Sequence, residues 1–219
     1  MSITSELIRS VTADLYERSL KKIPEDTKAA LHRAEVTDSS DTARKTLTIM
    51  LKSADESEKQ DHLICSDVGI PVYSVKIGTK VRFEGAVRQA MIDGLADLAA
   101  NIQPPILRMV TNPLTHQRGY AGKDMPIMTF DIMDEADYLE IICAPKAMGS
   151  GRWEALETFV YPTLEDIEKY ILEVVMKAGS QPCPPIVVGV GIGGTFDYAA
   201  RMAKQQILRP FGKINSESI

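Results

Sequence analysis

The period of the hydrophobic pattern changes near Leu63, and this change limits the fold more than any other feature of the sequence. Upstream, in residues 2–60, apolar side chains recur at helical spacing, as at Ile8, Val11 and Leu15. Downstream, short alternating or β-branched runs typical of strands are separated by amphipathic helices and glycine-containing loops. Chains that mix these two periods fold as α/β layers around a sheet.

We therefore predict an α/β fold, with an N-terminal helical layer followed by mixed-sheet α/β layers. The whole chain, 1–219, is expected to form one domain, because the sequence contains no internal repeat and no low-complexity linker. Residues 1–60 would form the helical layer and residues 61–219 the α/β part that carries the functional site. The length is sufficient for one large domain or for two small subdomains that share a core.

Capping residues and apolar spacing predict the individual elements. Ser2 or Thr4 can cap the first helix, Pro24 opens the second, and a third begins near Ser40. The later expected elements are a strand at 70–77, a helix at 83–102, a strand at 106–110, a strand pair at 127–133 and 138–144 joined by an acidic turn, a helix at 164–178, and a final strand, glycine cluster and helix within 184–208.

Composition and charge argue against several classes of protein. Hydrophobic residues make up 44% and charged residues 25% of the chain, as in ordinary globular proteins. No apolar run approaches the roughly 20 residues that cross a bilayer. The formal net charge is −5 without a basic stripe, which argues against nucleic acid as a partner. Because the N-terminus lacks the pattern of a signal peptide, we expect a cytoplasmic protein with no membrane partner.

Three cysteines, Cys65, Cys143 and Cys183, offer the most distinctive chemistry. Their odd number and the absence of a CxxC pair argue against a disulfide framework. Each is either a small buried apolar residue or a thiolate ligand of a soft metal centre. Cys65 lies two residues before Asp67, so both side chains can point to one side of an extended segment. Cys183 lies among three prolines, which suit either a stiff ligand support or a simple strand entry.

A glycine motif, Gly189-x-Gly191-x-x-Gly194, lies between an expected strand and an expected helix. A dinucleotide-binding fingerprint has this spacing, but it also needs an acidic residue at the end of a further strand, and no such strand follows. Two interpretations remain. The loop binds a carboxylate or phosphate at the helix N-terminus, or it is a tight packing turn, and Thr195 is either a helix cap or a ligand contact.

Cationic or titratable side chains gather in and beside the polar loops. They are Arg108, His116, Arg118, Lys123, Lys146 and Arg152. Any one of them is typical of a solvated surface, but together they would form an anion pocket.

Segments along nearly the whole chain resemble the alpha part of the class I, iron–sulfur-dependent fumarate hydratase and L(+)-tartrate dehydratase family. Residues 182–209, PCPPIVVGVGIGGTFDYAARMAKQQILR, follow the family pattern almost residue by residue. Residues 63–78, 107–118 and 144–151 are similar to three further family segments. The resemblance implies the alpha-type fold and a hydro-lyase that reversibly hydrates or dehydrates a small hydroxy-dicarboxylic acid of the fumarate/malate or tartrate type.

The resemblance also implies a set of site residues, by matching position. Cys65 and Cys183 would be ligands of a [4Fe–4S] cluster whose open iron acts as a Lewis acid. Asp67 would lie near that iron, and Arg108 would bind a substrate carboxylate. The residues expected to contact the substrate are Ser66, Gly149, Gly191, Gly193, Gly194 and Thr195.

Departures from the family pattern leave the third cluster ligand open. In the family, the third cysteine lies beyond the point that residue 219 reaches and the catalytic base lies on a beta part, so we expect a beta-type hydro-lyase subunit and an oligomer. Cys143 either replaces the missing ligand or substitutes for an aliphatic core residue, and we favour the core position. Ser66 and Val68 stand where the family has glutamine and threonine. Two alternatives stay open: a cluster-less, shortened paralogue that binds a small anion or regulates, and a mononuclear site, such as zinc, that needs another ligand.

Overall fold

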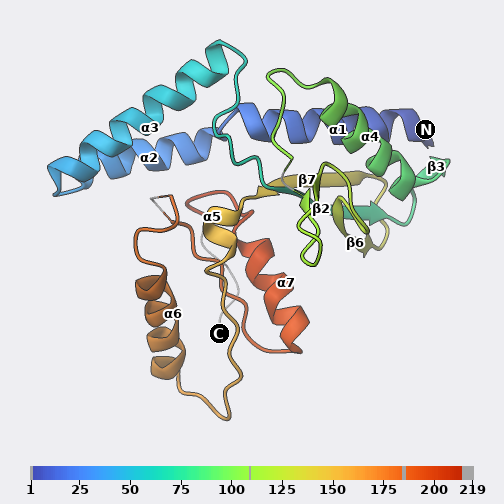
Figure 1. Cartoon of the computed structure of the whole chain (residues 1–219). Helices are drawn as coiled ribbons and strands as arrows, with labels where there is room; N and C mark the ends of the chain where they lie inside the picture. Colours follow the sequence, from blue (N-terminus) through green and yellow to red (C-terminus); the bar gives the residue numbers. More distant parts are fainter. Residues whose placement is uncertain (1, 109, 184–185, 214–219) are drawn as a thin grey trace. The chain divides into compact units, whose positions relative to one another are not determined.

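A computed structural model describes residues 2–108, 110–183 and 186–213 (Figure 1). Helices and small mixed sheets are both present, which confirms the predicted α/β class. Among the described residues, no helix has the length and apolar character needed to cross a membrane.

Two compact units make up the chain. Unit 1 contains Met1–Ile23 and Lys45–Ala147, and unit 2 contains Pro24–Arg44 and Met148–Ile219. The N-terminal helical region is therefore shared between the two units.

The first helix of unit 1, α1 (Ser5–Lys21), begins at one of the predicted caps. The hydroxyl of Thr4 accepts a hydrogen bond of 3.2 Å from a backbone N–H in the first turn. Residues Ser2–Thr4, which were expected to be helical, instead form strand β1, parallel to β3 (Arg82–Glu84). Because these three residues of β3 pair with the N-terminus, the helix predicted for 83–102 begins only after them.

Helix α4 (Val87–Asn101) packs closely against α1. Its buried side chains include Met91 and Leu98, on the face that the helical period predicts. A Cβ on Gly94 would lie 2.4 Å from the backbone carbonyl oxygen of Arg9 on α1, so glycine allows the two helices to approach.

A three-stranded sheet, in the order β6-β2-β7, lies in unit 1. Strand β2 (Ile70–Gly78) runs parallel to β6 (Ile127–Met133) and antiparallel to β7 (Leu139–Lys146). The sequence predicted all three strands but joined the last two as a pair, which is wrong. Strand β2 pairs with both of them and lies between them. Its Tyr73 and Val75 side chains are fully buried, whereas β6 and β7 are partly exposed along their length.

The connection between β6 and β7 crosses the end of β2 at Gly78. The backbone N–H of Gly78 donates to the carbonyl oxygen of Tyr138 at 3.0 Å, and that of Lys80 donates to Ala136 at 2.9 Å. A Cβ on Gly78 would lie 2.3 Å from the Ala136 carbonyl oxygen. Glycine at this position therefore allows β6 and β7 to flank β2 instead of pairing directly.

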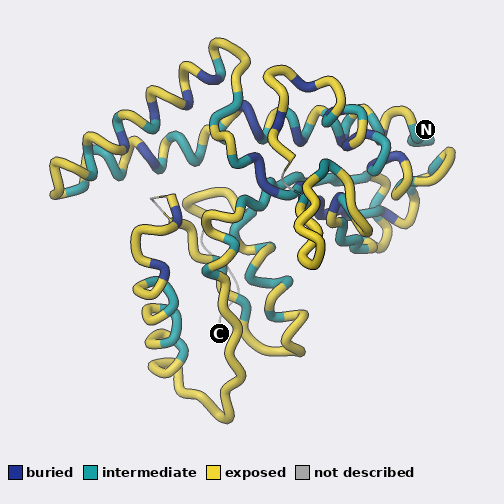
Figure 2. Tube along the Cα trace, viewed as in Figure 1, coloured by how far each residue is buried: buried dark blue, intermediate teal, exposed yellow. Residues whose placement is uncertain are grey.

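The core of unit 1 is formed mainly by α1, α4 and β2, where the buried segments gather in Figure 2. Its buried side chains are Ile8, Tyr16, Leu20, Val68, Tyr73, Val75, Ala90, Met91, Leu95, Leu98, Ile102 and Ile106.

The strand predicted at 106–110 is largely wrong. Residues 106–108 form no strand, and Met109 lies outside the described residues. Val110–Thr111 forms β4, which pairs with β5 (Arg118–Gly119) as a short antiparallel ladder within the polar loop.

Three further helices begin where the sequence predicts. Helix α2 (Glu25–Thr37) follows Pro24, and α3 (Asp41–Lys59) follows Ser40. Helix α6 (Leu164–Ala178) has the predicted bounds. Helical propensity, caps and spacing are local properties, so these elements are well defined by the sequence.

The final predicted strand, glycine cluster and helix are only partly correct. Helix α7 (Phe196–Gln206) confirms the helix. Residues 186–192 form no strand, and Pro184 and Pro185 lie outside the described residues. A strand needs hydrogen-bonding neighbours, and the described part of the chain places no other strand beside this β-branched segment.

Candidate functional site

The site residues expected from the sequence divide between the two units. Unit 1 carries Cys65, Ser66, Asp67, Arg108 and Cys143. Unit 2 carries Gly149, Cys183, Gly191, Gly193, Gly194 and Thr195. Within each unit, the fold brings part of the set together.

Cys65, Ser66 and Asp67 lie in the loop that leads from α3 into β2. Cys65 and Ser66 are exposed, and Asp67 is partly buried. The backbone N–H of Asp67 donates to Sγ of Cys65 at 3.4 Å, and the N–H of Gly69 donates to Oδ1 of Asp67 at 3.3 Å. Hydrogen bonds to sulfur stabilise and tune thiolate ligands. Cys65 thus combines the exposure and the N–H donor that suit a metal ligand, with an ordered carboxylate beside it.

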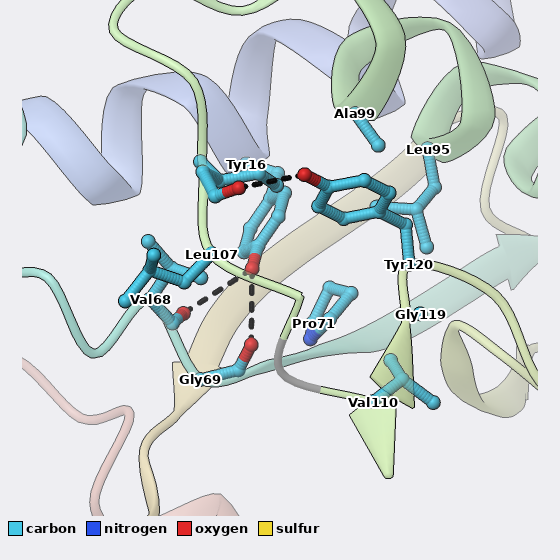
Figure 3. A pocket seen from close by; sticks show the side chains of 11 residues that line it. Tyr16, Val68, Gly69, Pro71, Leu95, Ala99, Leu107, Val110, Gly119 and Tyr120 are labelled. Carbon is cyan, nitrogen blue, oxygen red and sulfur yellow. Dashed lines mark hydrogen bonds between the residues drawn. The ribbon is translucent and has the colours of Figure 1, made fainter. Parts of the chain in front are cut away.

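Gly69 fixes the path of this loop. Its φ of +67° lies in the left-handed region, and a Cβ would lie 2.5 Å from the carbonyl carbon of Lys146 at the end of β7. Glycine satisfies both requirements. On the other side, the Tyr16 hydroxyl lies 3.2 Å from the carbonyl oxygens of Val68 and of Gly69 (Figure 3).

Arg108 lies on an exposed segment supported by Tyr120. Its guanidinium carbon is 5.8 Å from the centroid of the Tyr120 ring, within the range of a cation–π interaction. The Tyr120 hydroxyl donates to the carbonyl oxygen of Ile106 at 2.8 Å. One tyrosine thus holds the backbone before Arg108 and lies under its side chain.

The two segments line the same small pocket in unit 1 (Figure 3). Val68 and Gly69 contribute from the Cys65 loop, and Leu107 and Tyr120 contribute from the Arg108 side. The remaining lining residues are Tyr16, Pro71, Leu95, Ala99, Ile106, Val110 and Gly119. The lining is mainly apolar, so the anion-binding groups are the neighbours of these residues and not the pocket wall itself.

Cys143 packs against the hydrophobic core of unit 1. It pairs with Tyr73 across the β2–β7 ladder. Burial raises the pKa of the Cys143 thiol to about 12, although side-chain hydrogen bonds with Tyr73 and Ser19 act to lower it. Because metal ligands are thiolates, these surroundings favour the core alternative over the role of a third ligand.

In unit 2, the segment of Gly149 is linked to the segment of Cys183. Arg152, just after α5 (Met148–Gly151), donates from its guanidinium to the side-chain oxygen of Gln181 at 2.8 Å. Cys183 is exposed and follows the buried Pro182. A Cβ on Gly149 would meet nothing within 4 Å, so its backbone is accessible from that side.

The glycines before α7 serve close packing and a turn. A Cβ on Gly189 or Gly191 would lie 2.2 or 2.1 Å from carbonyl oxygens of α7. Gly193 and Gly194 have φ values of +86° and +71°, which lead the chain into the helix. These contacts explain why glycine occupies each position.

The first turn of α7 contains a carboxylate of its own, Asp197. Interactions with the Thr195 side chain, and with the backbone N–H groups of Asp197 and Tyr198, lower the pKa of Asp197. An external carboxylate or phosphate would use the same N–H groups. This geometry favours the packing turn over the anion-binding loop.

The thiols of Cys65 and Cys183 are of the chemical type that binds an iron–sulfur cluster. Across the part of the chain that the structure describes, no group of three or more His, Cys, Asp or Glu residues is arranged to hold a metal ion. Cys65 and Cys183 are exposed thiols, one on each unit, and thiolates are the ligands that such clusters take. Cys143 does not fit, since its thiol is held neutral in the core.

Comparison with known proteins defines the family. The sequence model of fumarate hydratase (Fumerase) matches residues 9–219. A putative L(+)-tartrate dehydratase subunit alpha of Methanocaldococcus jannaschii is 32% identical over 213 residues, which are 94% of this chain and 74% of the relative. A putative class I fumarate hydratase of Geobacillus stearothermophilus is 24% identical, with 89% of this chain and 39% of the relative covered. An L(+)-tartrate dehydratase subunit alpha of Escherichia coli O157:H7 is 23% identical, with 95% and 68% covered.

A match that covers nearly the whole chain places it among the hydro-lyases. The chain belongs to the fumarate hydratase (Fumerase) family. The resemblance found in the sequence is thereby confirmed.

Sequence reasoning missed two residues beside the candidate site, Tyr16 and Tyr120. Tyr16 lies among apolar positions of α1 and Tyr120 in a polar loop, so neither stands out as functional. For Tyr16, the available signal was a hydroxyl at a position that the helical period predicts to be buried, because a buried tyrosine requires a hydrogen-bond partner.

Proposed function

We propose that this chain is the alpha-type part of an iron–sulfur-dependent hydro-lyase acting on a small hydroxy-dicarboxylate of the fumarate/malate or tartrate type. The observation that carries the proposal is the exposed Cys65 thiol beside an ordered Asp67, on a loop that shares a pocket with the Arg108 segment. The printed names of the relatives, fumarate hydratase and L(+)-tartrate dehydratase, support this reaction class.

Arg108 would bind a carboxylate of the substrate. Its exposed guanidinium offers the planar pair of donors that carboxylates prefer, and the ring of Tyr120 limits its freedom. Loss of water from a hydroxy acid requires loss of a proton from a carbon next to a carboxylate, and negative charge then spreads onto that carboxylate. A guanidinium already in place stabilises this charge.

Cys65 and Cys183 would hold a [4Fe–4S] cluster. When bound, a cluster with one iron free of protein ligands supplies a Lewis acid for the departing hydroxyl group. Asp67, whose carboxylate is held by the Gly69 N–H, would orient that hydroxyl. Exposed Ser66 and the accessible backbone of Gly149 would add hydrogen bonds to the substrate.

A beta-type subunit is expected to complete the enzyme. Two of the relatives are named subunit alpha, which implies a second component in those proteins. The assembled oligomer would work in the cytoplasm, where thiols stay reduced.

Anaerobic iron–sulfur reconstitution of the chain, with and without a co-expressed beta-type partner, tests the proposal. Absorption and EPR spectra would be recorded for wild type, Cys65→Ala, Cys183→Ala and Cys143→Val. We expect a cubane signal that is lost in the first two variants and kept in Cys143→Val, because the third position is a core residue of similar volume. Loss of the signal in a folded Cys143→Val would instead make Cys143 a ligand. Water addition to fumarate and water loss from tartrate would then identify the substrate.

A second candidate function, a cluster-less paralogue that binds a small anion, is favoured by one observation. The third cysteine of the chain, Cys143, packs against the core of unit 1, where burial raises the pKa of its thiol. Under this alternative, no cluster assembles even with the partner, and a dicarboxylate still binds in an Arg108-dependent manner.

A further inference from the structure

We propose that Tyr16 is a positioning residue that sets the orientation of the Asp67 carboxylate through the peptide group between Val68 and Gly69. The inference rests on the proposed function, since it assigns Tyr16 a role through a residue of that site.

The argument begins with one peptide plane. The carbonyl oxygen of Val68 and the N–H of Gly69 belong to the same rigid peptide group. The Tyr16 hydroxyl lies 3.2 Å from this carbonyl, and the N–H donates to Oδ1 of Asp67 at 3.3 Å. A hydrogen bond to the Val68 carbonyl oxygen, at one edge of the plane, therefore also orients the Gly69 N–H group at the opposite edge.

Tyr16 is well suited to hold this plane still. Its side chain lies in the core of unit 1 and is only 2% exposed, on a helix anchored by the Thr4 cap. The hydroxyl is shared between the carbonyl oxygens of Val68 and Gly69. Burial raises the pKa of Tyr16, with smaller contributions from Cys143 and Asp67, so the hydroxyl stays protonated as a donor around neutral pH.

The position of Gly69 is constrained on the side of β7, because a Cβ there would lie 2.5 Å from the carbonyl carbon of Lys146. Rotation of the 68–69 peptide would change φ of Gly69 and ψ of Val68. It would also break the hydrogen bond from Tyr16 to the Val68 carbonyl, so Tyr16 opposes that rotation. Hydrogen bonds linked in series through a peptide strengthen one another.

Tyr73 provides a matched control. It is also fully buried in the core of unit 1, and its hydroxyl donates to the carbonyl oxygen of Thr12 at 2.9 Å, within α1. Tyr73→Phe thus removes a buried tyrosine hydroxyl without touching the loop. Tyr16→Phe keeps the ring and removes only the hydroxyl.

The first readout needs neither cluster nor substrate: the exchange rate of the Gly69 amide hydrogen, measured by NMR on the full chain. Tyr16→Phe should speed this exchange about fivefold, because the loss of one hydrogen bond to a buried carbonyl frees the peptide. Tyr73→Phe should leave it unchanged. In an Asp67→Ala background, which removes the acceptor, adding Tyr16→Phe should change the rate no further.

The second readout is the steady-state rate of the reconstituted enzyme with its partner. Tyr16→Phe should lower kcat about tenfold with little change in KM, because Asp67 would act on the hydroxyl and not in carboxylate binding. Unchanged Gly69 exchange in Tyr16→Phe, or an equal rise in Tyr73→Phe, would overturn the positioning role. Faster Gly69 exchange with unchanged kcat would uphold the positioning of Asp67 and refute its part in the proposed reaction.

Discussion

At the scale of single residues, the three cysteines have very different surroundings in the fold. Cys65 and Cys183 are exposed, whereas Cys143 faces Tyr73 and packs against the core. A thiol that cannot ionise neither coordinates a metal nor attacks an electrophile. Exposure of the thiol is therefore the property that separates the candidate ligands from the core residue.

Alkylation should separate the cysteines in the native chain. With iodoacetamide at about pH 8, we expect modification of Cys65 and Cys183 and almost none of Cys143, because a pKa of about 12 leaves roughly one thiol in ten thousand ionised. Peptide mass spectrometry would locate the adducts. All three should react in guanidinium chloride, which is the control. Equal rates at Cys65 and Cys143 without denaturant would contradict the core position.

The same thiol should make stability fall at alkaline pH. Its pKa rises from the ordinary 9.0 to about 12 on folding, so between these values the unfolded chain loses a proton that the folded chain keeps. The unfolded state is then favoured as pH rises, and below about pH 9 the effect vanishes. Buried Tyr16 and Tyr73, whose pKa values are also raised, act in the same direction above about pH 10.

Urea unfolding at several pH values would measure this effect. Comparison with Cys143→Val measures the thiol together with its effect on the nearby tyrosines, because Cys143 also raises the pKa values of Tyr16 and Tyr73. The free energy of unfolding should fall less steeply from about pH 9 upward in Cys143→Val than in wild type. Parallel curves would show that the folded thiol ionises freely.

At the scale of elements, close backbone contacts decide which helices and strands meet. Gly94 on α4 faces the Arg9 carbonyl of α1, and Gly78 at the end of β2 faces the Ala136 carbonyl. Neither contact follows from a hydrophobic period, since the partners are far apart in the chain. A missing Cβ is thus as important here as an apolar side chain.

Gly94→Ala tests this contact against helical propensity. Alanine favours the helix by about 1 kcal/mol over glycine. Here, however, its Cβ would lie 2.4 Å from a backbone oxygen of α1, so we expect a net loss of about 1–3 kcal/mol in the free energy of unfolding. Chemical denaturation would measure it. Ala96→Gly, at an exposed position of the same helix, should cost about 1 kcal/mol and show that propensity operates there. A more stable Gly94→Ala would refute the close contact.

The sequence predicted elements whose determinants are local. The Thr4 cap, the helix after Pro24 and the bounds of α6 all follow from residues a few positions apart. The placement of β2 between β6 and β7 depends on pairings between residues 55 to 76 positions apart along the chain, so it could not be predicted from the period alone.

The same distinction between local and long-range determinants applies to the residues of the candidate site. Cys65, Asp67 and Arg108 could be named from a resemblance, because they lie in recognisable segments. The Tyr16 contact with Val68 spans 52 residues, and only the fold brings these residues together. Asp197, the acidic residue in the first turn of α7, was not among the predicted site residues, although acidic side chains are favoured at helix N-termini.

At the scale of the whole molecule, the two units differ in how much apolar surface they bury. Unit 1 has a continuous core contributed by α1, α4 and β2. In unit 2, the only buried residue of α6 is Ala178, and the described residues of α7 include none (Figure 2). Large exposed apolar side chains of this unit are Val160, Tyr161, Leu164, Leu172, Met176, Ile192 and Phe196. A contiguous exposed apolar surface is typical of an interface with another polypeptide, so these side chains make unit 2 the part of the chain to test for such an interface.

Amide hydrogen exchange of the isolated chain should be slower in the buried core of unit 1 than in the exposed helices of unit 2. We expect the slowest exchange in β2 and α4, whose side chains are packed in a core, and faster exchange in α6 and α7, whose helices gain little from burial. Because binding to the folded state suppresses local opening, a beta-type partner should slow exchange in α6 and α7 and leave β2 nearly unchanged. Mass spectrometry of peptides from each helix, with and without the partner, would measure both effects. If α6 and α7 were as protected as β2 in the isolated chain, unit 2 would be stable by itself and its apolar side chains would not require a partner.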